Sequence, residues 1–180
     1  MILSLFTNLF LLFNVLVVGQ PQQAIDIVEK TDQIKVYIFL LDECKICHHY
    51  SLSLTELYNT YESGQIEFVG LFPNFVSKPK EISKFKKNYK IPFPLKTDYY
   101  KSKAKKFGVT VTPEVVVYND TKDEILYKGR IDNSYFKLGK QRTHTTKFEL
   151  RDALQAITAG EEITVKETLS VGCFINFNEN

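Results

Sequence analysis

The sequence contains no tryptophan, a single methionine at position 1 and only three cysteines among 180 residues. With three cysteines, any intramolecular pairing scheme leaves one thiol free or exchanging. An excess of either charge is also missing, since 23 basic and 21 acidic residues give a formal net charge of +2. This balance predicts no particular attraction to nucleic acid or to an anionic membrane. Repeats are absent, and 44% hydrophobic residues suit one globular domain with a core.

The first nineteen residues contain no charged side chain and are rich in Leu, Phe and Val. They are long enough for the apolar segment of a signal peptide, and Val17-Val18-Gly19 is an acceptable cleavage site. A retained membrane anchor is the competing interpretation, because about 18 apolar residues is the lower limit for spanning a bilayer. We expect export to the periplasm or the extracellular space, with membrane contact only if residues 1–19 are retained. Disulfides form and persist in such compartments.

Strand-like and helix-like segments alternate after this leader. Residues 34–42 and 66–72 are β-branched, aromatic and almost wholly apolar, which is typical of strands buried on both faces. An amphipathic helix follows each strand, the first ending near Gly64 and the second covering residues 81–89. The first helix is expected to bury Tyr50, Leu54, Leu57, Tyr58 and Tyr61.

The second half of the chain continues this alternation. A third helix is predicted over residues 99–107 and ends at Gly108, in the position where a left-handed residue closes a helix. Residues 109–120 and 124–131 are predicted to form two strands joined by a polar turn.

The last predicted helix begins at Thr146, with Glu149 three residues further on as the partner in a capping box. Its core-facing residues are expected to be Leu150, Ala153, Leu154 and Ile157. The order strand–helix–strand–helix–strand–strand–helix predicts an α/β layered domain.

Two of the three cysteines lie in the stretch FLLDECKICHHY, spaced C-x-x-C and placed directly after the first buried strand. Cys44 is expected at the N-terminus of a helix, where unpaired N–H groups and the helix dipole favour a thiolate. A lysine and two histidines nearby add positive charge when protonated. The pattern predicts Cys44 as the nucleophile toward a disulfide and Cys47 as the thiol that resolves the mixed disulfide.

A second feature is Val111-Thr112-Pro113, at the start of a predicted strand. Proline is normally excluded from strands except at the first residue or at an edge. The layout resembles the thioredoxin-like fold, in which a cis-proline at the equivalent strand start lies against the redox cysteines. The resemblance implies that Pro113 shapes the peptide-binding surface.

Other stretches resemble one group of exported redoxin-domain proteins related to the alkyl hydroperoxide reductase/thiol-specific antioxidant family. The resemblance runs from about residue 33 to 176, and its most specific parts are Gly129-Arg130-Ile131-Asp132 and Val171-Gly172-Cys173. It implies a thioredoxin-like three-layer α/β fold, in which helices flank a central mixed β-sheet. The implied organisation is a redoxin domain over residues 20–160 and a C-terminal tail over residues 161–180.

The resemblance also concerns the cysteines. In that group, the positions matching Cys44 and Cys173 carry cysteine, whereas the position matching Cys47 usually does not. Cys173 follows the last predicted helix by about fourteen residues, an extended reach of roughly 45 Å, so the tail can fold back to the C-x-x-C. Cys173 is therefore either a resolving or relay cysteine, or a thiol that packs against the domain or pairs with another molecule. The expected disulfide is Cys44–Cys47, with Cys44–Cys173 as the alternative.

Three other interpretations remain open. Peroxide reduction would use Cys44 as the peroxidatic thiol and Cys173 as its resolver; peroxiredoxins place a Thr or Ser three residues before that cysteine, where this chain has Leu41. Copper or zinc would be held by the C-x-x-C pair and His144. Haem would use the literal C-x-x-C-H motif with His49 or His144 as the second axial ligand, since Met1 is the only methionine.

The favoured hypothesis is an exported thiol–disulfide oxidoreductase that requires no cofactor. Its expected substrates are cysteine pairs of other exported proteins, and it would exchange electrons with a redox-partner protein. No nucleic-acid partner is expected.

Overall fold

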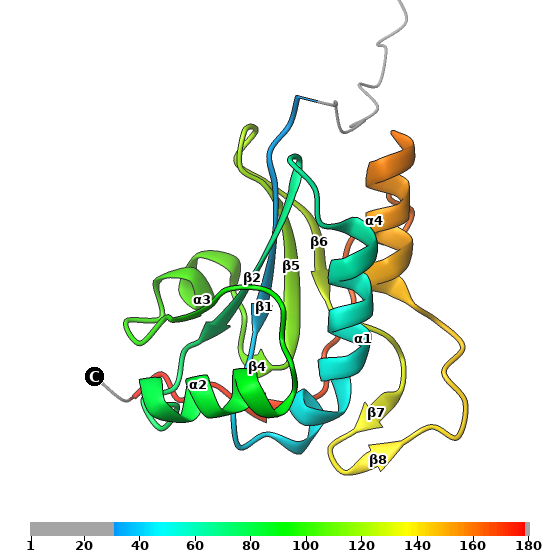
Figure 1. Ribbon diagram of the computed structural model, residues 1–180. Coiled ribbons are helices and arrows are strands. Elements are labelled where there is room, and N and C mark those ends of the chain that lie inside the picture. Colours follow the sequence, from blue (N-terminus) through cyan, green and yellow to red (C-terminus); the bar gives the residue numbers. More distant parts are fainter. Residues whose placement is uncertain (1–30, 179–180) are drawn as a thin grey trace, which may run out of the picture.

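The structure is a computed structural model, and it describes residues 31–178 (Figure 1). The predicted signal peptide or anchor, residues 1–19, lies outside the described residues. Within the described part, no helix is long and apolar enough to cross a membrane.

A mixed sheet of five strands forms the centre of the domain, in the order β3-β2-β1-β5-β6. The strands are β1 (Ile34–Phe39), β2 (Ile66–Phe72), β3 (Leu95–Thr97), β5 (Glu114–Asn119) and β6 (Glu124–Gly129). The first three run parallel, and β5 and β6 pair antiparallel to their neighbours. All six residues of the inner strand β5 are buried, because helices cover both faces of the sheet.

Within residues 31–178, four helices complete the layers: α1 (Lys45–Tyr61), α2 (Pro79–Asn88), α3 (Ser102–Phe107) and α4 (Glu149–Ala159). The buried hydrophobic side chains of α1, α2 and α4 join one core, whereas those of α3 join a second core. In Figure 1, α3 lies on the opposite side of the sheet from α1 and α4. Helices therefore lie on both sides of a mixed sheet, which confirms the predicted thioredoxin-like three-layer fold.

The predicted helix faces agree with the structure. In α1, Tyr50 and Leu54 are buried, and the other three predicted residues pack against the same core while partly exposed. All four predicted core residues of α4 are buried. Gly108 ends α3 in the left-handed conformation, with φ of 63°.

The predicted capping box at the start of the last helix is wrong. Helix α4 begins at Glu149, and its N-cap residue, Phe148, makes no side-chain capping bond. The backbone N–H of Thr146 donates to Asn133 Oδ1 at 2.9 Å, and Asn133 Nδ2 donates to Thr146 Oγ1 at 2.9 Å. Glu149 forms an ion pair with Arg130. Both residues of the expected box thus have partners outside the helix.

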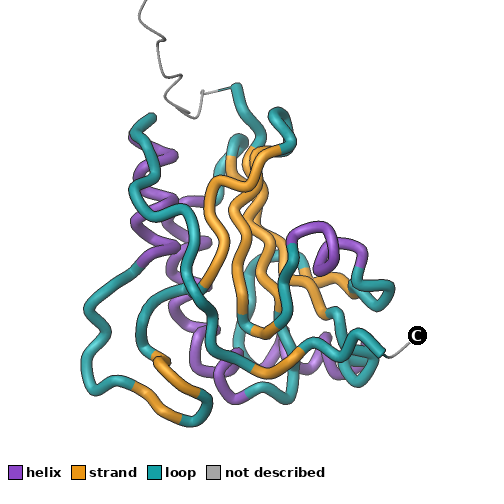
Figure 2. The backbone as a smooth tube through the Cα atoms, turned by 180° about the vertical axis from the view of Figure 1, so that it is seen from behind, coloured by secondary structure: helices purple, strands orange, loops and turns teal. Residues whose placement is uncertain are grey.

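Two small strand pairs lie outside the main sheet, and Figure 2 shows them from behind. The strand β4 (Val111–Thr112) pairs antiparallel with β9 (Cys173–Phe174), which belongs to the C-terminal tail. The strands β7 (Tyr135–Lys137) and β8 (Lys140–Gln141) form a hairpin. In Figure 1 the hairpin lies at the end of the molecule where α1 begins.

Candidate active site

Cys44 is the N-cap residue of α1, directly after the turn that leaves β1. Its side chain is only 1% exposed. As a thiol it donates to the carbonyl oxygen of Thr112 at 3.4 Å. Because the first turn of a helix presents unpaired N–H groups, this position favours a negative charge on the sulfur.

The pKa of Cys44 is lowered to about 5 from the model-compound value of 9.0. The largest cause is a hydrogen bond from the thiol of Cys47, and further contributions come from Cys173 and from the backbone N–H groups of Cys47 and Ile46, while burial opposes them. Burial and the neighbouring Cys44 raise the pKa of Cys47. The same two causes raise the pKa of Cys173 to about 12. One thiolate, on Cys44, is thus stabilised by two protonated neighbours.

Cys173 lies beside Cys44 although 129 positions separate them in the sequence, and their Sγ atoms are 2.7 Å apart. The pairing of β9 with β4 produces this placement, because Thr112 and Cys173 are directly opposite each other. The hydroxyl of Thr112 also donates to the carbonyl oxygen of Cys173 at 3.3 Å. All three cysteines of the described residues carry free thiols.

Gly172 allows the tail to approach this closely. A Cβ atom at position 172 would lie 2.1 Å from the carbonyl oxygen of Thr112 and 3.1 Å from the nitrogen of Pro113. Only a residue without a side chain leaves room for that backbone. Gly172 therefore allows the backbone of β9 to pack against Thr112 and Pro113, which places the Cys173 thiol beside Cys44.

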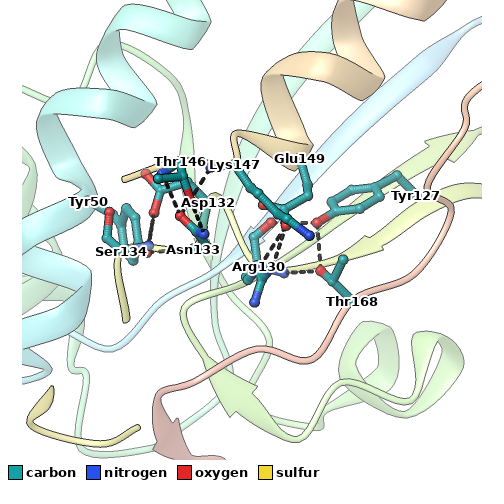
Figure 3. Close-up of polar contacts among 10 residues, drawn as sticks. All are labelled: Tyr50, Tyr127, Arg130, Asp132, Asn133, Ser134, Thr146, Lys147, Glu149 and Thr168. Atoms are coloured by element: carbon teal, nitrogen blue, oxygen red, sulfur yellow. Dashed lines mark hydrogen bonds and ion pairs between the residues drawn. The ribbon is translucent and has the colours of Figure 1, made fainter. Parts of the chain in front are cut away.

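The tail is fixed again upstream, at Thr168 (Figure 3). Its hydroxyl accepts the backbone N–H of Arg130 at 3.1 Å and lies 2.8 Å from the hydroxyl of Tyr127. Arg130 in turn pairs with Glu149 of α4. Gly129 makes this contact feasible, since a Cβ there would lie 2.1 Å from Thr168 Oγ1. The tail is therefore attached to β6 before it reaches the cysteines.

A second polar cluster in Figure 3 supports the loop that carries the β7–β8 hairpin. Asp132 Oδ1 accepts the hydroxyl of Tyr50 and the backbone N–H of Ser134, both at 2.7 Å. Asn133 Oδ1 accepts the backbone N–H groups of Thr146 and Lys147. These bonds join the two ends of the loop to each other and to α1.

The peptide bond between Thr112 and Pro113 is cis. Thr112, the residue before it, contacts both Cys44 and Cys173. The structure thus brings together Cys44, Cys47, Cys173 and Pro113, the residues to which the sequence analysis assigned chemistry. Thr112 and Gly172 had no predicted role of their own, although each lies directly before one of these residues in the sequence.

The histidines considered as metal or haem ligands have other contacts or are exposed. His48 Nε2 is 2.5 Å from the carbonyl oxygen of Asp42, and its ring stacks on Tyr89 at 4.7 Å. His49 contacts Gln141 of the hairpin, and His144 is exposed. Within residues 31–178, no group of three or more His, Cys, Asp or Glu side chains is arranged to hold a metal ion.

Residues 19–128 match the AhpC/TSA family, and this segment is more than half of the chain. The chain belongs to the AhpC/TSA family. The AhpC/TSA match includes Cys44, Cys47 and Pro113, and it ends before the hairpin and the tail that carries Cys173.

Solved structures show the same fold. An uncharacterized conserved protein from Geobacillus kaustophilus is 22% identical, covers 83% of this chain and 79% of its own, and has a TM-score of 0.70. A hypothetical protein from Sinorhizobium meliloti is also 22% identical. The match covers 82% of this chain and 81% of that protein, with a TM-score of 0.69. A putative thioredoxin from Neisseria meningitidis is 17% identical over 71% of this chain and 74% of its own, with a TM-score of 0.52. A comparison with curated proteins gave no match.

Proposed function

We propose that the protein is a thiol–disulfide oxidoreductase in which Cys44 and Cys173 form the exchanging pair. The observation that carries this proposal is the 2.7 Å separation of their sulfur atoms, together with the lowered pKa of the Cys44 thiol. A thiolate is the nucleophile in disulfide exchange, and a second thiol within reach can resolve the mixed disulfide.

The exchange runs in two steps. The Cys44 thiolate attacks one sulfur of a substrate disulfide, forms a mixed disulfide and releases the other substrate sulfur as a thiolate. Cys173 then loses its proton and attacks the Cys44 sulfur, which forms the Cys44–Cys173 disulfide and releases the second substrate thiolate. The substrate gains two electrons, and the protein loses them.

The charge on Cys44 controls the order of these steps. While Cys44 is a thiolate, it helps to keep Cys173 protonated and unreactive. When Cys44 enters the mixed disulfide, its negative charge disappears, so this contribution to the high pKa of Cys173 is lost. Burial still raises the pKa of Cys173, but without the neighbouring charge Cys173 loses its proton more easily in the mixed disulfide than in the reduced protein.

Cys47 has a different role in this scheme. It is fully buried, and its thiol donates the hydrogen bond that contributes most to the low pKa of Cys44. Its own pKa is raised by burial, so it remains a protonated donor. We assign Cys47 as a positioning residue for the thiolate and Cys173 as the resolving residue.

The substrates we propose are cysteine pairs of other exported proteins, with export directed by the uncharged residues 1–19. A protein disulfide must displace β9 to reach Cys44, because Thr112 and Cys173 cover its sulfur.

Peroxide reduction is the second candidate, and the position of the Cys173 thiol beside the Cys44 thiolate favours it, because a sulfenic acid on Cys44 would have a thiol next to it to form the disulfide. Cys44 is only 1% exposed, so a peroxide molecule, like a protein disulfide, reaches its sulfur only when β9 moves. The peroxide would oxidise Cys44 to a sulfenic acid and release water, and Cys173 would then form the disulfide with loss of a second water. Leu41 places no hydroxyl group in the position that peroxiredoxins use.

The deciding experiment is peptide mapping of the wild type, Cys47→Ser and Cys173→Ser proteins after mild oxidation, with free thiols alkylated before digestion. We expect a Cys44–Cys173 disulfide in the wild type and in Cys47→Ser. A Cys44–Cys47 disulfide in the wild type, with Cys173 alkylated, would overturn the assignment. Turnover of a peptide disulfide and of hydrogen peroxide by Cys47→Ser then separates the two candidate activities.

A further inference from the structure

A groove lies directly beside Cys173, between the start of α1 and the β7–β8 hairpin. Its volume is about 360 Å³. We call it the hairpin groove and define it by its lining residues: Glu43, Lys45, Ile46, Tyr135, Leu138, Gly139, Gln141 and Cys173. Cys44 does not line the groove, so Cys173 is the thiol that this surface presents.

The hairpin exposes a large apolar side chain in the wall of the groove. Leu138, at the tip of the hairpin, lines the groove and is 58% exposed. Exposed apolar side chains next to a reactive group are typical of a surface that another molecule covers.

The same hairpin is strongly basic. Residues 133–148 include Lys137, Lys140, Arg142 and Lys147 and contain no acidic residue. Lys137 and Lys140 flank the tip residues Leu138 and Gly139 in the chain, and they form no ion pair within the described residues. The groove wall itself carries Glu43 and Lys45, whose charges balance. The net positive charge of this surface therefore comes from the exposed Lys137 and Lys140 of the adjoining hairpin, which do not line the groove.

The hairpin groove is also preformed. The Asp132 and Asn133 hydrogen bonds described above fix both ends of the loop. Gln141 contacts His49 of α1 at 3.4 Å, and Tyr135 packs edge-on against the same ring. A rigid surface loses little conformational entropy when a ligand binds.

We propose that the hairpin groove binds an extended segment of a partner redox protein whose reactive cysteine is flanked by apolar and acidic side chains, and that this cysteine attacks Cys173. Acidic side chains complement Lys137 and Lys140, and apolar ones cover Leu138. The inference rests on the Cys44–Cys173 disulfide of the proposed function, and it names the partner that reduces that disulfide.

The chemistry of the disulfide favours attack at the same sulfur. The thiolate of the partner bonds to the Cys173 sulfur and expels Cys44 as a thiolate; a second thiol of the partner then displaces Cys173, which takes up a proton. The partner becomes a disulfide, and both cysteines of this protein become reduced. A thiol of low pKa leaves faster, and the expelled Cys44 thiolate is stabilised by the Cys47 thiol and by the backbone N–H groups at the start of α1, so Cys44 is the better leaving group.

The test measures how fast oxidised full-length protein is reduced by two synthetic peptides, Glu-Phe-Cys-Leu-Glu and Lys-Phe-Cys-Leu-Lys. Peptide mapping first verifies that the oxidised protein contains the Cys44–Cys173 disulfide. We expect the acidic peptide to react at least about 10-fold faster at low ionic strength, and we expect high salt to remove most of the difference. Iodoacetamide added during the reaction alkylates the expelled thiolate, so that mapping can locate the peptide on Cys173.

Two double variants are compared with the wild type. Lys137→Glu/Lys140→Glu should reverse the preference, and the matched control Lys96→Glu/Lys105→Glu, which changes exposed lysines outside the groove by the same charge, should preserve it. Dithiothreitol should reduce all three proteins at the same rate, which verifies that the variants are folded.

The outcomes distinguish a failure of the proposed function from a failure of the inference about the hairpin groove. Absence of the Cys44–Cys173 disulfide in the oxidised protein would overturn the proposed function and the inference together. With the disulfide present, equal rates for the two peptides, an unchanged preference in Lys137→Glu/Lys140→Glu, or a peptide found on Cys44 would overturn the inference alone.

Discussion

Replacement of Cys47 by alanine should raise the pKa of Cys44 and slow its reaction as a nucleophile. The Cys47 thiol makes the largest contribution to the low pKa of Cys44, and it is fully buried, so water does not replace it easily. A hydrogen bond to a charged group contributes about 1.5–3 kcal/mol. Because one pKa unit corresponds to about 1.4 kcal/mol, the expected rise is about 1–2 units. The pKa of Cys44 should therefore increase from about 5 to about 6–7.

The assay is the rate of alkylation of Cys44 by iodoacetamide as a function of pH, with the modified peptide identified by mass spectrometry. All variants carry Cys173→Ser, so that no resolving thiol competes, and Cys173→Ser alone is the reference. Cys173 also lowers the pKa of Cys44, so the effect of Cys47→Ala is measured relative to Cys173→Ser: the pKa should rise by about 1–2 units from that reference, and the thiolate fraction at pH 6 should fall.

Cys47→Ser is the matched control, because its hydroxyl retains a donor toward Cys44. Its profile should remain closer to the reference than that of the alanine variant. An identical pH profile in the reference and the alanine variant would refute the assignment of Cys47 as the donor that stabilises the thiolate.

Three further predictions concern the tail and the thiolate. Gly172→Ala should slow formation of the Cys44–Cys173 disulfide by about 10²-fold in quenched-oxidation mapping, because the new Cβ forces β9 away from Thr112; formation at the wild-type rate would show that the close approach is unnecessary. Thr168→Val removes the hydrogen bonds to Arg130 and Tyr127 and should lower the free energy of unfolding in urea by about 1–3 kcal/mol, with an unchanged midpoint as the contrary result. The pKa of Cys44 is lower in the folded protein, so the unfolded chain binds more protons between about pH 5 and 9, and the reduced protein gains stability as pH rises through this window. The stability difference between wild type and Cys44→Ser should grow from pH 6 to pH 8 by up to about 1.4 kcal/mol per unit, and a constant difference would contradict the low pKa.

Much of the fold follows from local patterns in the sequence. The strand predicted over residues 66–72 is β2, and the apolar run that precedes the C-x-x-C contains β1, because continuous β-branched runs have few alternatives to a buried strand. The capping box failed because a local motif at Thr146 competed with a partner, Asn133, that only the folded loop brings near. Local chemistry is therefore predictable where no distant residue offers a better partner.

The residues of the candidate site also fall into two groups: those that local motifs predict and those that only long-range contacts place. The C-x-x-C at a helix start and the proline before a strand are local signals, and both predicted where Cys44 and Pro113 lie. The position of Cys173 depends on β4 and β9, which are two residues each and too short to show any periodicity. Gly129 and Gly172 indicate where the tail packs against the domain, since at each position another segment lies too close to leave room for a side chain. The sequence alone does not say which segment approaches them.

The 129 positions between Cys44 and Cys173 have a consequence for the stability of the whole protein. A bond between these residues would close a loop that contains most of the folded domain. In the chain-entropy description, a loop of that size restricts the unfolded chain enough to stabilise the native state by about 5 kcal/mol. Each catalytic cycle would then alternate between a more and a less stable molecule. Resistance to proteolysis or heat would report how much of the protein is oxidised at any moment, so turnover and lifetime would be coupled through a single covalent bond.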